Sequence, residues 1–156
     1  MAKDLKEDLD FILWMLIMQV RNVVYKAREK ELSQYGVTPE QSGALFAIRT
    51  IGKEATISAL GTWLVREPHS VASLLNRMEQ HGLIIKKKSQ GGRKSATYTL
   101  TPKGDEVYYH SIKRASIHRT MSTFSKEERS NLESYLRKIL RTMLREMANE
   151  MKPPWP

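Results

Sequence analysis

The spacing of hydrophobic residues predicts a chain built mainly from helices. In residues 4–32 apolar side chains recur every three or four positions, which is the period of one long amphipathic helix. Residues 11–18 are apolar on every side of this helix, and such a helix needs cover from two directions. We expect the chain's own fold to cover one side and a second subunit to cover the other. A membrane is the less favoured cover, because the apolar run is too short to span a bilayer.

Capping motifs divide the middle of the chain into shorter helices. Thr38-Pro39-Glu40-Gln41 is a capping box with proline at the first helical position, and Gly52 ends the helix that it opens. Two more helices are predicted at 56–64 and 68–81, with a short break between them and Gly82 as the C-terminal stop of the second. The arrangement is a helix, a turn and a helix.

After Gly82 the pattern changes to the period of a strand. Residues 83–88 and 96–100 are predicted strands, and the loop between them has a Gly91-Gly92 tip next to basic residues, so the two form a hairpin. A further helix is predicted over 102–121, and residues 151–156 form a tail. Ser125-Lys126-Glu127-Glu128 is the capping box of a last helix, whose apolar stripe consists of Leu132, Leu136, Ile139, Leu140, Met143 and Met147.

The charge of the chain is concentrated in its middle. The 156 residues include 26 Lys and Arg against 17 Asp and Glu, a formal net charge of +9. Residues 56–104 carry +6 of it, since only Glu67 and Glu79 oppose eight basic residues there. A local excess of this kind is either an ordinary solvated face or the site of an anionic partner, with nucleic acid as the first candidate and a membrane surface as the second.

The motifs that the sequence lacks exclude several classes of protein. It has no cysteine, which removes disulfides, thiolate catalysis and Cys-ligated zinc. No signal-peptide pattern is present, so we expect a cytoplasmic protein. Because no phosphate-binding loop, Rossmann fingerprint or nucleophile elbow occurs, we expect no enzymatic activity, no catalytic residues and no cofactor. Glu106 and His110 have the spacing of two metal ligands on one helix face, but without a third ligand we expect no metal site.

Two helices and a basic hairpin follow one another in the order of a winged helix-turn-helix, whose second helix enters the DNA major groove. In residues 68–81 the apolar positions have the spacing of one buried face. An ordinary surface helix would show the same pattern, so this helix alone does not show whether the protein binds DNA. The side chains left outside are His69, Ser70, Ala72, Ser73, Asn76, Arg77 and Gln80. The Asn, Ser, His and Arg side chains among them can contact base edges or phosphates, and Ala72 leaves room for close approach.

Residues 55–104 resemble the MarR family of transcriptional regulators, and the flanking helices fit the arrangement of that family. The resemblance rests on three stretches in the same order: Leu60-x3-Leu64-x6-Val71-x2-Leu74-Leu75-Asn76-Arg77-Met78-Glu79-x2-Gly82-Leu83-Ile84, then Gly92-Arg93-Lys94, then Leu100-Thr101-Pro102-Lys103-Gly104. The chain departs from the family at two places. Gln90-Gly91-Gly92 stands where the family's wing carries an aspartate, and Val65-Arg66-Glu67 stands where it has small turn residues.

The resemblance implies a mainly α (α+β) fold with long N- and C-terminal dimerisation helices. The winged helix-turn-helix lobe would span 38–104 and the dimerisation region 4–32 and 105–150, in a single intertwined domain. It also implies a homodimer that binds a pseudo-palindromic operator in double-stranded DNA, usually as a repressor. The DNA-binding residues that we predict are His69, Ser70, Ser73, Asn76 and Arg77 on the second helix, and Lys87, Arg93 and Lys94 on the wing, where Arg93 matches the arginine that enters the minor groove.

A site for a small effector is the last expectation. Members of the family that the chain resembles bind aromatic or phenolic molecules in a cleft between the dimer helices and the lobe, which Trp14, Met18, Tyr25 and Trp63 could line. Packing in the core or the dimer interface is the alternative for each of these four. Two other function classes stay open at this point: a winged-helix protein-interaction module with weak DNA binding, and a peripheral membrane protein that uses residues 11–18.

Overall fold

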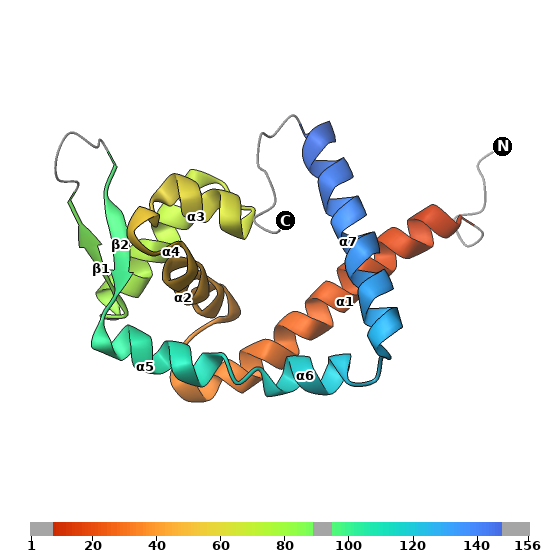
Figure 1. Ribbon diagram of the computed structural model, residues 1–156, viewed down its shortest axis with the longest axis horizontal. Helices are drawn as coiled ribbons and strands as arrows, with labels where there is room; N and C mark the ends of the chain where they lie inside the picture. The colour runs from red at the N-terminus through yellow and green to blue at the C-terminus, as the bar shows by residue number, and fades with distance from the viewer. Residues whose placement is uncertain (1–7, 89–94, 148–156) are drawn as a thin grey trace.

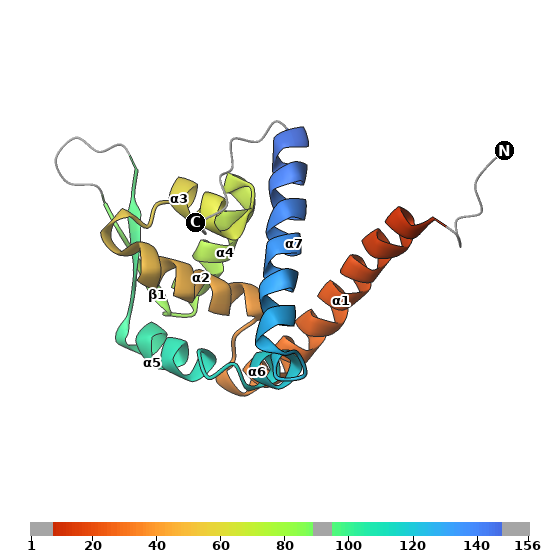
Figure 2. The same ribbon diagram turned by 45° about the vertical axis from the view of Figure 1, so that its right-hand side comes forward.

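Two helical arms project from a lobe of shorter helices and one β-hairpin (Figure 1). The structure is a computed structural model that describes residues 8–88 and 95–147. The arms are α1 (Leu9–Leu32) and α7 (Lys126–Glu146). They diverge from each other when the molecule is turned, and each has one end close to the lobe (Figure 2).

The predicted capping residues fix where the helices begin. Asp8 starts α1 by accepting hydrogen bonds from the backbone N–H groups of Asp10 and Phe11. The two capping boxes are confirmed, because both reciprocal bonds form at α2 (Pro39–Ile51) and again at α7. At α2 the Thr38 hydroxyl accepts from Gln41 N at 3.2 Å, while the Gln41 side chain accepts from Thr38 N at 3.0 Å.

The predicted helix-turn-helix consists of α3 (Ile57–Leu64) and α4 (Pro68–Gln80). Between them Val65 adopts the left-handed conformation with φ 53°, and Arg66 N donates to Gly61 O at 2.9 Å. A Cβ on Gly61 would lie 2.9 Å from the Arg66 carbonyl oxygen, so a residue without a side chain lets the turn close here. The turn is therefore tight although Val65-Arg66-Glu67 are not small.

One hydrophobic core joins the lobe and fixes the orientation of α4. Val71, Leu74, Leu75 and Met78 of α4 are at most 1% exposed, as the sequence predicts. Antiparallel strands β1 (Ile84–Lys87) and β2 (Thr97–Leu100) add the inner side of the hairpin, with Ile84 opposite Leu100. The buried hydrophobic residues of this core are Leu32, Val37, Ala44, Leu45, Ala47, Ile48, Ala55, Leu60, Val71, Leu74, Leu75, Met78, Leu83, Ile84 and Tyr98.

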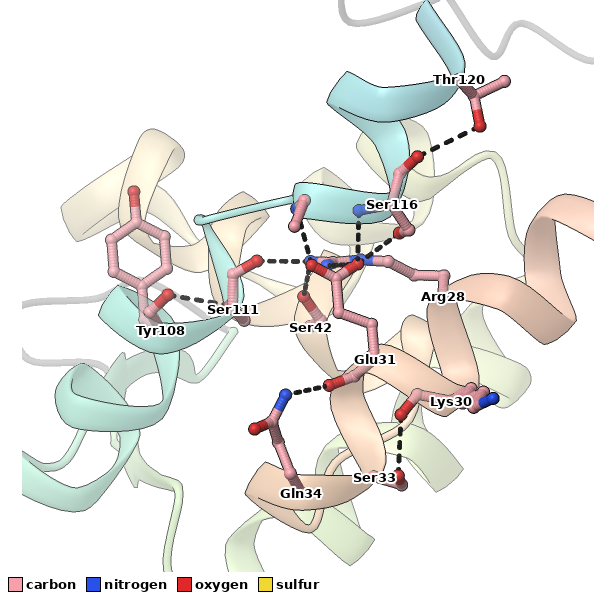
Figure 3. Close-up of polar contacts among 11 residues, drawn as sticks. Arg28, Lys30, Glu31, Ser33, Gln34, Ser42, Tyr108, Ser111, Ser116 and Thr120 are labelled. Carbon is pink, nitrogen blue, oxygen red and sulfur yellow. Dashed lines mark hydrogen bonds and ion pairs between the residues drawn. The ribbon is translucent and has the colours of Figure 1, made fainter.

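The single helix predicted over 102–121 is wrong. The structure has two helices there, α5 (Pro102–Ser111) and α6 (Ala115–Met121), separated by a break in which Arg114 is left-handed with φ 50°. Neither glycine nor proline occurs in residues 105–121, so local sequence does not predict the break. Its cause is a pair of side chains from α1 that bind the backbone on both sides of it (Figure 3).

The arms carry large apolar side chains that the structure leaves uncovered. The N-terminal two thirds of α1 is exposed on all sides, with Trp14 at 55% and Leu13 at 50%. Leu136, Ile139, Met143 and Met147 are exposed along one side of α7. Within the described ranges no helix is long and apolar enough to cross a membrane.

Gly104 sets how closely α5 approaches the hairpin. A Cβ at this position would overlap the Leu83 carbonyl oxygen, which already accepts a hydrogen bond from Thr101 N at 3.1 Å. The turn between α4 and β1 is also bound by the Thr101 hydroxyl, which donates to Gly82 O at 2.6 Å, and by Lys103 Nζ, which donates to His81 O at 2.8 Å. The start of α5 is therefore fixed to the end of α4.

We expect Gly104→Ala to lower the free energy of unfolding by about 2 kcal/mol, since backbone must move to admit the methyl group. Gly43→Ala is the matched control. Gly43 lies within α2, and its Cβ would be 3.8 Å from Leu64 Cδ2, an ordinary contact. Alanine there should be neutral or stabilise the helix by up to about 1 kcal/mol. Urea unfolding followed by circular dichroism measures both, and equal values for the two variants would contradict the argument.

Candidate functional site

The exposed face of α4 holds the predicted DNA-contacting side chains of that helix. His69, Ser73, Asn76 and Arg77 are exposed, and Ser70 is half-buried near the start of the helix. They share one side because the opposite side is the apolar face in the core. Glu79 is the only carboxylate on α4, so the first nine positions of the helix, from Pro68 to Asn76, carry no negative side chain.

The hairpin adds positive charge beside this helix. Lys86, Lys87 and Lys88 are all exposed at the end of β1. A hollow of about 360 Å³ lies at the base of the hairpin, and both Lys86 and Pro68, the first residue of α4, line it. Lys86 and the start of α4 are thus neighbours. Arg93 and Lys94, which we predict to contact DNA, lie outside the described residues.

Two of the basic residues counted in the sequence are engaged elsewhere. Arg66 Nη2 lies 3.9 Å from Glu40 Oε1, and Lys103 donates to a backbone carbonyl at the turn after α4. Arg77 and the three hairpin lysines are therefore the described basic side chains best placed to meet an anionic partner along α4 and β1.

A cleft of about 280 Å³ lies between α1 and the lobe. Of the four residues predicted to bind an effector, Tyr25 lines it. Trp14 instead stacks on Phe11 with ring centroids 6.3 Å apart, Met18 is 41% exposed on α1, and Trp63 packs against Phe46 with centroids 5.5 Å apart. The lining residues of the cleft are Arg21, Tyr25, Pro39, Glu40, Gly43, Leu64, Arg66 and Leu74.

Charged groups in the cleft are organised around the Glu40 carboxylate. Tyr25 donates its hydroxyl hydrogen to Glu40 Oε2 at 2.8 Å, and the Arg21 guanidinium carbon lies 5.6 Å from the centroid of the Tyr25 ring. The bond to Glu40, together with burial, raises the pKa of Tyr25 above its ordinary value. Burial acts to raise the pKa of Glu40, but hydrogen bonds from Tyr25, from its own backbone N–H and from Thr38, together with the charge of Arg66, outweigh it and lower that pKa.

The cleft therefore combines one ionised carboxylate with two guanidinium groups over an apolar floor. Sequence reasoning missed Arg21, Glu40 and Arg66. Their meeting depends on how α1 packs against α2 and on the turn before α4, which no periodicity indicates. Glu40 was recognisable only as part of a capping box.

The histidine considered as a metal ligand has an aromatic partner. The His110 ring stacks on Tyr35 with centroids 5.1 Å apart and an interplanar angle of 14°, while Glu106 is exposed. Among the residues that the structure describes, no group of three or more His, Asp or Glu side chains could hold a metal ion.

Comparison with known proteins identifies relatives that regulate transcription. The model of the MarR family matches residues 35–95. The transcriptional activatory protein BadR of Rhodopseudomonas palustris is 26% identical over 143 residues, which are 88% of this chain and 82% of BadR.

Solved structures share the whole fold, arms included. The organohalide-sensing transcriptional regulator RdhR, in its 2,4-dichlorophenol-bound form, has a TM-score of 0.87 and 26% identity, covering 100% of this chain and 95% of that one. A mutant of MarR from E. coli complexed with operator DNA has a TM-score of 0.78 and 19% identity, covering 89% of this chain and 99% of that one.

The family match covers the segment in which α2, the helix-turn-helix and β1 meet, and the structural matches extend the likeness to both arms. The fold, the polar exposed face of α4 and the relatives all indicate the same class of protein. The chain thus has a MarR-family segment over residues 35–95 and the winged helix-turn-helix fold of these relatives, which are transcription regulators and not enzymes.

Proposed function

We propose that this regulator binds a pseudo-palindromic operator as a homodimer, with α4 of each subunit in a major groove and the hairpin on the flanking backbone. The observation that carries the proposal is the face of α4, which has polar and basic side chains outward and Lys86 of the hairpin beside its first residue. The structure of MarR with operator DNA, which shares the fold, supports the proposal that this protein binds operator DNA.

The residue types on α4 suit base and phosphate contacts. In the proposed complex Asn76 and Arg77 contact base edges, since amide and guanidinium groups can form paired hydrogen bonds with adenine and guanine. His69, Ser70 and Ser73 contact bases or phosphates nearer the start of the helix. Lys87 and the predicted wing residues Arg93 and Lys94 contact the flanking DNA.

Uncovered apolar surface on the arms supports the homodimer. On α6 and α7 a groove of about 510 Å³ is lined by apolar side chains with charged ones at its edges: Met121, Leu132, Leu136, Leu140, Arg129, Glu133 and Arg137. The exposed apolar side chains of α1 extend this surface. Apolar patches of such extent are typical of interfaces, and a second copy of the chain offers the same patches in return.

Arg77→Ala should weaken operator binding about tenfold or more, because it removes a contact to the DNA at the centre of the interface. Lys138→Ala, which removes an equal charge from the polar side of α7, is the control and should change affinity less than twofold. Fluorescence anisotropy with labelled operator measures both. Equal effects of the two substitutions would mean that α4 has no special role.

Salt dependence separates this proposal from a winged-helix protein-interaction module. Binding to DNA through phosphates should fall linearly with the logarithm of salt concentration, because counterions are released. A flat salt response, or equal affinity for operator and random duplex, would favour the protein-interaction module.

Leu136→Glu should dissociate the dimer, since a carboxylate would be buried in the apolar surface of α7. We expect the dimer dissociation constant to rise at least tenfold, and operator binding to weaken with it. Ser134→Glu places the same charge on another side of the helix and should leave the dimer intact. Sedimentation equilibrium at several concentrations tests this, and a dimeric Leu136→Glu protein would overturn the proposed interface.

We further propose that the cleft between α1 and the lobe binds a small aromatic anion that alters DNA binding. Its volume is near the lower end of the range for ligand pockets, about 300–1,000 Å³. Arg21 and Arg66 can neutralise a carboxylate or phenolate, while Leu64 and Pro39 contact a ring. The likeness to RdhR with bound 2,4-dichlorophenol supports this choice of ligand class.

Benzoate and 2,4-dichlorophenol are suitable probes for the cleft. We expect binding to wild-type protein by titration calorimetry, and about tenfold weaker binding to Arg21→Gln, because a charged hydrogen-bond partner is lost. Arg141→Gln on α7 is the control. Unchanged affinity in Arg21→Gln would exclude the cleft as the site.

Repression stays a prediction. The relative BadR is described as an activator, and the sign of regulation depends on where the operator lies relative to the promoter. In vitro transcription from a promoter that carries the operator distinguishes the two roles.

A further inference from the structure

The break between α5 and α6 is unusual because its own residues do not favour it. Arg114 is one of two non-glycine residues with positive φ among those described. The left-handed conformation is unfavourable for a residue with a side chain, and no side-chain hydrogen bond from Arg114 caps the first turn of α6. Contacts from elsewhere in the molecule must therefore stabilise the break.

Two side chains of α1 replace the hydrogen bond that an unbroken helix would make here. In a continuous helix Ala115 N would donate to Ser111 O, four residues earlier. Instead, Arg28 Nη2 donates to Ser111 O, and Ala115 N donates to Glu31 Oε1 at 2.6 Å. Both halves of the missing bond are thus occupied, one by each member of an Arg28–Glu31 pair (Figure 3).

The pair is tied together and to both helices. Arg28 Nη1 lies 2.8 Å from Glu31 Oε2, and the two side chains are only 11% and 16% exposed. Glu31 Oε2 also accepts from the backbone N–H of Ser116 at 3.3 Å and from its hydroxyl, so Glu31 caps α6 from outside. Arg28 Nη2 lies 3.5 Å from the Ser42 hydroxyl oxygen of α2.

The charges of the pair match the helix ends that they meet. A guanidinium lies at the C-terminus of α5 and a carboxylate at the N-terminus of α6, as the helix dipoles favour. Burial acts to raise the pKa of Glu31, but hydrogen bonds from the Ser116 side chain, Arg28 and the backbone of Ser116 and Ala115 outweigh it and lower the pKa to about 2. The carboxylate is therefore charged at neutral pH.

The break lies where the lobe ends and the arm begins. α5 packs against α2 and β2 in the lobe, whereas α6 packs against α1 and leads into α7. If α5 and α6 formed one straight helix, α7 would point in another direction relative to α4. The angle between α5 and α6 at residues 112–114 thus sets the orientation of each lobe relative to its α7.

We propose that Arg28 and Glu31 are positioning residues for operator recognition: by holding the α5–α6 break bent, they set the distance between the two α4 helices and hence the half-site spacing that the dimer accepts. The inference rests on the proposed homodimer on DNA. It makes the accepted half-site spacing depend on Arg28 and Glu31, two residues that lie away from the exposed face of α4.

Distances between the two lobes test the proposal directly. Because the chain has no cysteine, Gln80→Cys on the exposed end of α4 gives one spin label per subunit. We expect one narrow distribution of distances between the two labels in the otherwise wild-type dimer. Glu31→Gln, which removes the charge and keeps the size, should shift the mean by more than about 5 Å, one helical turn, or broaden it to that width.

Arg114→Gly and Arg114→Ala form a matched pair. Both lose the guanidinium that lies 5.0 Å from the centroid of the Phe46 ring. Glycine accepts the left-handed conformation and disfavours a continuous helix, whereas alanine does the reverse. Arg114→Gly should therefore keep the wild-type distance, and Arg114→Ala should change it in the same sense as Glu31→Gln.

Operators with half-site spacings varied one base pair at a time supply the functional readout. Wild type and Arg114→Gly should prefer one spacing, and Glu31→Gln should lose about tenfold affinity there but less than twofold at neighbouring spacings. Equal loss at every spacing, or unchanged lobe distances in both Glu31→Gln and Arg114→Ala, would overturn the inference.

Failure of the proposed dimer would give a different result. In that case the parent protein with the Gln80→Cys label shows no distance between subunits. Hydrogen exchange of residues 112–116 then tests the break in single chains, and Arg114→Ala should exchange at least fivefold more slowly than Arg114→Gly. Equal exchange in these two variants would contradict a break that is held against the helical tendency of its own residues.

Discussion

Burial of one face of α4 is the constraint on which the rest of the structure depends. Val71, Leu74, Leu75 and Met78 are at most 1% exposed, and α4 packs against α2, α3 and β1. Since these four fix the rotation of the helix, its polar side chains must point outward. The face proposed to meet DNA is thus a product of core packing, and substitutions in the core alter it as surely as substitutions on it.

A single chain buries the apolar residues of the lobe but not those of the arms. The lobe has a closed core, whereas α1 and α7 expose apolar residues such as Trp14 and Leu136 over much of their length. Exposure of such hydrophobic surface to water is unfavourable, and covering it with another surface is therefore favourable. The proposed dimer would complete the arms and would also make the geometry between two lobes a property of the assembly.

Local sequence determines most of the lobe, and this is why it could be predicted. The capping boxes at Thr38 and Ser125, the apolar spacing of α4 and the alternation of Thr97–Leu100 act over a few residues, and the structure agrees with each. The break at Arg114 could not be predicted, because its cause lies more than 80 residues away in Arg28 and Glu31. Arg21, Glu40 and Arg66 also meet only through tertiary packing, whereas Tyr25 is predicted from the resemblance to a family whose members have an effector cleft at this place.

The close approach at Gly104 has a mechanical consequence. Three hydrogen bonds from Thr101 and Lys103, and a contact too tight for any side chain, fix the start of α5 to the turn between α4 and β1. α4, the two strands and α5 are therefore joined to one another at this point, and the break at residues 112–114 separates them from α6 and α7. In the proposed complex a ligand between α1 and the lobe would need no separate route to α4 and to the strands, because a change of angle at the break would displace them together.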